Sequence, residues 1–142
     1  MKWCAPLVLV GGFLFAADDP KDELKRLEGS YTMVSSEEKG AKLPEETVKT
    51  ATLNIEGDKH TAKVGKVTIV GTHKVDPTTT PAEIEASDTE GPYKGKTRLG
   101  IYKLEGDLFT FCFALPSKDR PEQFSTTSGT GHILVVWKKE KK

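Results

Sequence analysis

Short runs of β-branched and aromatic residues, separated by Gly, Asp and Pro, occupy most of the chain beyond residue 30. Such runs predict strands, because these side chains pack well on a pleated sheet and the residues between them favour turns. We expect eight strands, with these bounds: Ser30–Ser36, Ala51–Glu56, Lys59–Val64, Lys66–Val75, Ala82–Ala86, Thr97–Glu105, Leu108–Ala114 and His132–Lys138. The expected fold class is therefore all-β.

The turns between these runs indicate how the strands are arranged. Glu-Gly-Asp separates apolar runs at residues 56–58 and again at 105–107, where glycine can adopt the positive φ of a tight hairpin. The Pro77–Pro81 cluster is a third short turn. In a meander of antiparallel neighbours these short turns fall at one end of the sheet, and the long connections fall at the other. The long connections are residues 37–50, 87–96 and 115–131.

This arrangement predicts a small, closed, eight-stranded antiparallel up-and-down barrel with one loop-rich rim. Closure would leave no exposed sheet edge, which favours a barrel over the alternative, an open sandwich. The phenylalanines of the seventh expected strand share one face, and we expect them to point inward: Phe109, Phe111 and Phe113.

The first 17 residues predict a signal peptide, because a positive start is followed by the apolar stretch Ala5–Phe15 and by the small residues Ala16 and Ala17. A membrane anchor is the alternative, but the apolar stretch is shorter than the ~20 residues that a helix needs to cross a bilayer. We therefore expect a signal peptide at 1–17 and a barrel domain at 18–142. The protein would be exported, periplasmic or secreted, with no stable membrane span after cleavage.

One helix is expected, a short N-terminal segment over Asp18–Leu27, with Asp19 placed to cap it. Leu24 and Leu27 lie three residues apart on one face of this helix. The last strand is apolar on both faces over Ile133–Trp137, so the face outside the barrel needs a cover. We expect the two leucines, or a partner, to provide it.

Charge and motifs exclude several classes of function. Lys plus Arg and Asp plus Glu number 21 each, so the chain has no basic field that would attract nucleic acid. It contains no Gly-x-Ser-x-Gly motif. Cys112 lies in mid-strand between phenylalanines, where burial as a small apolar residue is expected rather than a reactive thiol. We predict that the protein is not an enzyme and needs no cofactor.

Three histidines raise the question of a metal site, since imidazole is a common zinc ligand. If a hairpin turns about Gly65, His60 and His73 have opposite parity from the turn and face opposite sides of the sheet. A register shift of one residue would reverse this expectation. We therefore predict no metal site from these two residues and His132.

Several spaced motifs resemble those of a known family. They are Gly91-Pro92-Tyr93-Lys94-Gly95-Lys96, Leu99-Gly100-Ile101-Tyr102, Arg120-Pro121-Glu122-Gln123-Phe124 and Gly129-Thr130-Gly131-His132. Together with Gly29-Ser30-Tyr31 at the first strand, they are similar to the uncharacterised lipocalin-like domain family that is abundant in planctomycete bacteria. The resemblance implies a lipocalin-like barrel over 18–142 and no particular activity, cofactor or partner. Analogy with lipocalins suggests small apolar ligands.

The loop-rich rim of such a barrel is where binding residues are expected, since loops on a rigid scaffold and barrel mouths commonly carry ligand sites. The candidate ligand-binding residues are Tyr93, Arg98, Arg120, Phe124 and His132. Two arginines and two aromatic rings suit a small ligand with an apolar body and an anionic or polar head.

A structural interpretation of the same residues stays open. The two arginines would then pair with acidic neighbours and hold the long loops in place, the acids being Asp88, Glu90 or Glu122. The inward phenylalanines would fill the barrel, since eight strands enclose only enough space for side chains or one small ligand. The sequence thus allows two functions: binding of a small apolar or amphipathic ligand at the mouth, or a filled barrel that presents its rim loops to a protein partner.

Overall fold

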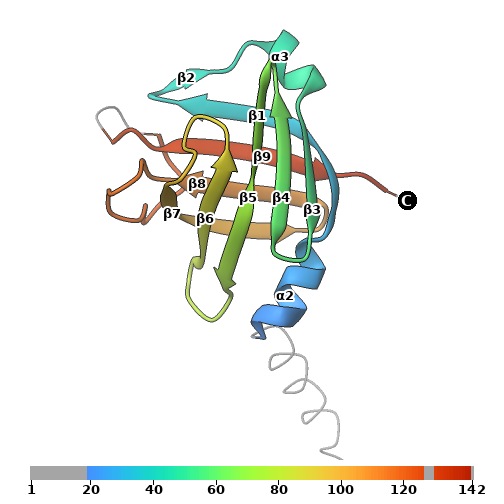
Figure 1. The fold of residues 1–142 in the computed structure, drawn as a ribbon, viewed down its shortest axis with the longest axis vertical. Coiled ribbons are helices and arrows are strands. Elements are labelled where there is room, and N and C mark those ends of the chain that lie inside the picture. The colour runs from blue at the N-terminus through green and yellow to red at the C-terminus, as the bar shows by residue number, and fades with distance from the viewer. Residues whose placement is uncertain (1–18, 127–129, 142) are drawn as a thin grey trace, which may run out of the picture.

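The computed structural model describes residues 19–126 and 130–141 of the 142-residue chain. This part of the chain consists mainly of strands, which form one closed antiparallel barrel with a short helix on its N-terminal side (Figure 1). The predicted signal peptide, residues 1–17, lies outside the described residues. Within them, no helix is long and apolar enough to cross a membrane.

The sheet closes on itself, as the sequence predicts. Its strands are β1 (Gly29–Glu38), β2 (Ala41–Lys42), β3 (Thr52–Glu56), β4 (Lys59–Val64), β5 (Val67–Asp76), β6 (Ala82–Glu90), β7 (Thr97–Glu105), β8 (Leu108–Phe113) and β9 (Ile133–Lys139). From β3 to β9 each strand pairs with the next, and β1 pairs with both β3 and β9, so eight strands complete the ring. The two-residue β2 pairs with the last residues of β1 at the rim.

The two ends of the barrel are those that the turn pattern predicts. The Glu-Gly-Asp turns join β3 to β4 and β7 to β8, and their glycines, Gly57 and Gly106, have φ of +59° and +64°. The long connections lie at the other end. The long connection between β1 and β3 contains regular secondary structure, namely β2 and the helix α3 (Glu45–Thr50). Two glutamates occupy the first turn of α3, where carboxylates interact favourably with the helix dipole.

The helix α2 (Pro20–Leu27) begins as predicted, because the Asp19 side chain accepts a hydrogen bond from a backbone N–H of the first turn at 2.8 Å. Its position corrects the expectation that it covers the outside of the last strand. Leu27 is fully buried and lines the barrel interior, so α2 closes the tight end of the barrel. Only Glu28 separates the helix from β1, and this short link keeps Leu27 beneath the ring of strands.

Hydrogen bonds hold this closed end together. Glu23 of α2 is buried and accepts from Arg26 at 2.8 and 2.9 Å and from the Tyr102 hydroxyl at 2.6 Å. Burial acts to raise the pKa of Glu23, but these hydrogen bonds outweigh it and lower the pKa. Inside the barrel, the Tyr31 hydroxyl donates to the Leu27 carbonyl at 2.6 Å, and burial raises the pKa of Tyr31 to about 12.

The outer wall of β7 and β8 is covered by the connection that follows β8. Ile101 and Cys112 face outward from these strands and are nevertheless buried. The Cys112 thiol lies 3.6 Å from the Ser125 carbonyl oxygen, and burial raises the pKa of this thiol. The expected burial of Cys112 is therefore confirmed, and residues 115–126 supply the cover.

Candidate functional site

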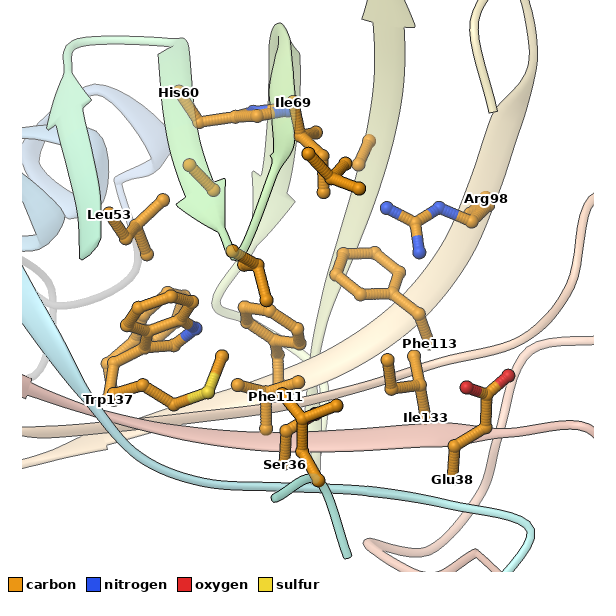
Figure 2. A pocket seen from close by; sticks show the side chains of 18 of the residues that line it. Ser36, Glu38, Leu53, His60, Ile69, Arg98, Phe111, Phe113, Ile133 and Trp137 are labelled. Atoms are coloured by element: carbon orange, nitrogen blue, oxygen red, sulfur yellow. The ribbon is translucent and has the colours of Figure 1, made fainter. Parts of the chain in front are cut away.

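A cavity of about 420 Å³ lies inside the barrel (Figure 2). Every strand of the ring contributes inward-facing residues to its lining, and most of these are apolar. The three phenylalanines of β8 are among them, so their predicted inward direction is confirmed. Small-molecule sites in proteins have volumes of about 300–1,000 Å³ and mostly apolar walls. The barrel interior thus has the size and character of a ligand site.

The cavity opens at the loop-rich rim and is closed at the tight end. At the rim its lining includes the exposed residues Lys42, Pro44 and Val67. At the opposite end its lining includes Leu27 and Trp137, both buried. The predicted mouth therefore coincides with the open end of the cavity.

Four polar side chains form a connected group in the barrel wall, the Asp88 cluster, which consists of His60, His73, Asp88 and Arg98. His60 Nε2 lies 3.0 Å from Asp88 Oδ1, and His60 Nδ1 lies 3.1 Å from His73 Nδ1. The two imidazole rings are stacked, with centroids 5.3 Å apart. Arg98 Nη2 donates to Asp88 Oδ2 at 3.5 Å. His60, His73 and Arg98 line the cavity, whereas Asp88 is 3% exposed and lies behind them.

The contacts determine where the protons lie when both rings are neutral. The Asp88 carboxylate can only accept, so His60 Nε2 carries the proton that it donates. His60 Nδ1 is then an acceptor, and the proton between the two rings belongs to His73 Nδ1. His73 Nε2 is left unprotonated, and it is buried without a hydrogen-bond partner among the described residues.

Burial lowers the pKa of His73 to about 4, and the neighbouring His60 acts in the same direction. The Gly57 carbonyl and the Asp58 carboxylate favour the protonated ring but do not offset these effects. His73 is therefore neutral at pH 7, in agreement with the proton arrangement above. Burial also lowers the pKa of Arg98, and the neighbouring Asp88 carboxylate acts in the opposite direction. The guanidinium keeps its positive charge at pH 7.

The shared direction of His60 and His73 shows that the sequence prediction for them was wrong. Residues 65 and 66 together form the turn between β4 and β5, so His60 pairs with Gly71. Gly71 and His73 lie two residues apart on β5 and face the same side, which points both histidines inward. The prediction centred the turn on Gly65 alone, and a shift of one residue moves a side chain to the other face. A two-residue hairpin with glycine first was the signal that would have placed the pair correctly.

Gly71 also provides the space in which the Asp88 cluster forms. It lies between His60 and Asp88 in the sheet. A Cβ atom at Gly71 would lie 2.8 Å from Asp88 Oδ1 and 2.3 Å from the Ser87 carbonyl oxygen. Its absence lets the carboxylate of β6 reach across β5 to the imidazole of β4.

Of the five candidate residues, Arg98 lines the cavity, and Tyr93 contacts Arg98 without being among the lining residues. Arg98 Cζ is 4.5 Å from the centre of the Tyr93 ring and 4.9 Å from that of Phe113. Arg98 also contacts Asp88, one of the acids that the structural interpretation names. Arg98 therefore fits both interpretations: it forms an ion pair within the barrel wall, and it lines the cavity where a ligand would bind.

The other three candidates lie elsewhere. Arg120 is outside the barrel, where Nη1 donates to one carbonyl of β6 at 2.9 Å and one of β7 at 2.6 Å, and Nε lies 3.7 Å from Glu83. Phe124 lies against the exposed Lys103, whose Nζ is 5.0 Å from its ring centre. His132 precedes β9 and is not among the cavity-lining residues. Residues 115–126 begin at the rim but fold back along the outer wall, which the sequence does not reveal.

The described residues, 19–126 and 130–141, contain no group of three or more His, Cys, Asp or Glu side chains arranged to hold a metal ion. The fold and the site together define a small closed antiparallel β-barrel with a mostly apolar internal cavity, and the Asp88 cluster lies in one wall of that cavity. Comparison with protein-family models, with curated proteins and with solved structures finds no match to this chain.

Proposed function

We propose that this protein is an exported, non-enzymatic, lipocalin-like barrel that binds one small apolar or amphipathic molecule in its interior. The observation that carries the proposal is the cavity of about 420 Å³, which opens at one rim. Burial of apolar surface from water drives the binding of such a molecule in an apolar site. The pattern of residues 1–17 supports export.

The cavity favours this function over a filled barrel that presents its rim loops to a protein partner. An eight-stranded ring is only wide enough to be filled by side chains or to hold one small ligand. Here small residues line the interior at several positions, among them Ala62 and Ala86, and the space beside them is open. A structural barrel gains nothing from that space, because cavities reduce stability.

The test is a fluorescence titration of the purified protein with N-phenyl-1-naphthylamine, a neutral apolar probe, supported by native mass spectrometry. We expect saturable binding of one probe per chain. Ala86→Phe, which adds bulk inside the cavity, should weaken binding at least tenfold. The matched control Thr72→Phe adds the same ring to the exposed face of β5 and should leave binding unchanged.

Either of two results would refute the proposed binding function or its site. Absence of saturable binding, together with native mass spectra that show no small-molecule adduct on protein purified from its own cells, would refute a binding function. Equal affinity of the wild type and the Ala86→Phe variant would place the probe outside the cavity and would refute this site.

A further inference from the structure

Arg98 is a largely buried arginine that uses few of its hydrogen-bond donors. Its side chain is 12% exposed and lines the cavity. A guanidinium carries five N–H donors. Among residues 19–126 and 130–141, the one acceptor for Arg98 is Asp88 Oδ2, at the long distance of 3.5 Å, and Nε is buried without a partner. Buried polar groups normally have hydrogen-bond partners, so the guanidinium lacks acceptors that a ligand in the cavity would supply to its terminal nitrogens.

The guanidinium is held in place by groups that do not use its hydrogen-bonding capacity. Tyr93 and Phe113 contact it through their rings, at 4.5 and 4.9 Å from Cζ to the ring centres. The Phe113 ring lies against Gly100, where a Cβ atom would be 2.6 Å from Phe113 Cδ1. The missing side chain at Gly100 therefore gives the ring its place beside Arg98. Such contacts restrict the orientation of the guanidinium before a ligand arrives.

Asp88 balances the charge of Arg98 without occupying its hydrogen-bonding edges. Its Oδ1 is engaged by His60 Nε2 at 3.0 Å, on the far side of Gly71. The carboxylate is thus drawn toward the histidines and away from an ideal bidentate contact with the arginine. The cationic residues that line the cavity are Arg98 and Lys42, and Glu38 at the rim is the acidic one.

We propose that the ligand is a monocarboxylate with an apolar body, and that its carboxylate accepts hydrogen bonds from Arg98 inside the cavity. The planar fork of a guanidinium matches the two oxygens of a carboxylate. In Figure 2 the Arg98 head group lies on one side of the pocket, Leu53 and Trp137 lie on the other, and Phe111 lies between them, so these three apolar side chains would receive the apolar body. This inference rests on the proposed binding function and specifies the chemistry of its ligand.

The test compares two ligands of equal chain length, dodecanoate and dodecan-1-ol, by isothermal titration calorimetry on the purified protein at pH 7.5. We expect dodecanoate to bind about 10- to 100-fold more tightly, which is the range of a hydrogen bond to a charged group. Arg98→Gln should abolish this preference and leave the affinity for the alcohol within about threefold. The matched control is Arg120→Gln, on the outer wall, which should retain the preference.

Arg98→Gln alone leaves the Asp88 carboxylate without its cationic partner, which can destabilise the fold, so a second variant is needed. Arg98→Gln combined with Asp88→Asn removes both members of the ion pair, so neither is left unpaired in the wall. It should also lose the preference for the carboxylate. Equal binding of the two ligands by the wild type, or a preference that survives in both Arg98 variants, would overturn the inference and leave the binding function standing. If neither ligand nor N-phenyl-1-naphthylamine binds, the proposed function itself fails.

Discussion

Acidification is expected to destabilise the barrel through His73. The unfolded chain takes up a proton on this side chain near pH 6.5, whereas the folded protein does so near pH 4. Between these values the unfolded state binds more protons, so stability falls as the pH falls through this window. The stabilising contribution is fully present above about pH 6.5 and absent below about pH 4. Lowering the pKa from 6.5 to about 4 corresponds to about 3 kcal/mol.

The assay is urea denaturation followed by circular dichroism at several pH values between 7.5 and 4. A loss of about 3 kcal/mol shifts the urea midpoint by about 1–3 M, given typical slopes for small domains. Carboxylates also titrate in this range, so the informative quantity is the difference between the wild type and His73→Gln. Glutamine retains a donor toward His60 but does not titrate. The groups that face His73 are His60, Asp58 and the Gly57 carbonyl, and all three are present in both proteins.

We expect the free energy of unfolding of the wild type to fall by about 3 kcal/mol more than that of His73→Gln between pH 7 and pH 4. Parallel pH profiles for the two proteins would refute the reasoning. They would mean that the folded protein accepts the proton as readily as the unfolded chain, and hence that the ring is not confined in the buried wall.

Two further substitutions test how the site and the closed end are built. Gly71→Ala places a Cβ atom 2.3 Å from the Ser87 carbonyl oxygen, and we expect a loss of about 1–3 kcal/mol or more in thermal or urea unfolding, because the backbone there cannot yield. Unchanged stability would show that β5 and β6 are less closely apposed. Tyr102→Phe removes the hydroxyl that donates to Glu23 at 2.6 Å, and we expect a loss of about 1–3 kcal/mol at pH 7. This loss should shrink at acidic pH as the carboxylate is protonated, and a pH-independent loss would contradict the role of the hydrogen bond.

The turns made the barrel predictable from the sequence, because their chemistry is local. Glu-Gly-Asp at 56–58 and 105–107 and the Pro77–Pro81 cluster mark one end of the sheet by residue type alone. The location of the mouth follows from that, and seven of the eight ring strands lie within two residues of their predicted bounds. The exception is β6, which was predicted to end at Ala86 but continues to Glu90, because it keeps pairing with β5 through Asp88 and Glu90. The inward face of β8 was predictable in the same way, since its phenylalanines alternate with smaller residues.

The polar wall was not predictable by such local signals. The Asp88 cluster joins residues of three strands, and its assembly depends on the register across β4, β5 and β6. That register depends on whether one or two residues form the turn after β4. Arg120 and Phe124 were misplaced for a different reason, since residues 115–126 carry no periodic pattern and their path follows from covering Ile101 and Cys112.

The pairing of β1 with β9 brings the first and last strands of the ring side by side. Lys139 pairs with Tyr31, and the Glu140 N–H donates to the Ser30 carbonyl at 2.7 Å. Both strand ends meet at the tight end, on the side of the molecule away from the mouth. A linker attached after Lys141 would therefore anchor the barrel to a solid support with its opening turned toward solution. Immobilised in this way, the protein would work as a sensor surface on which binding and washout proceed without obstruction from the support.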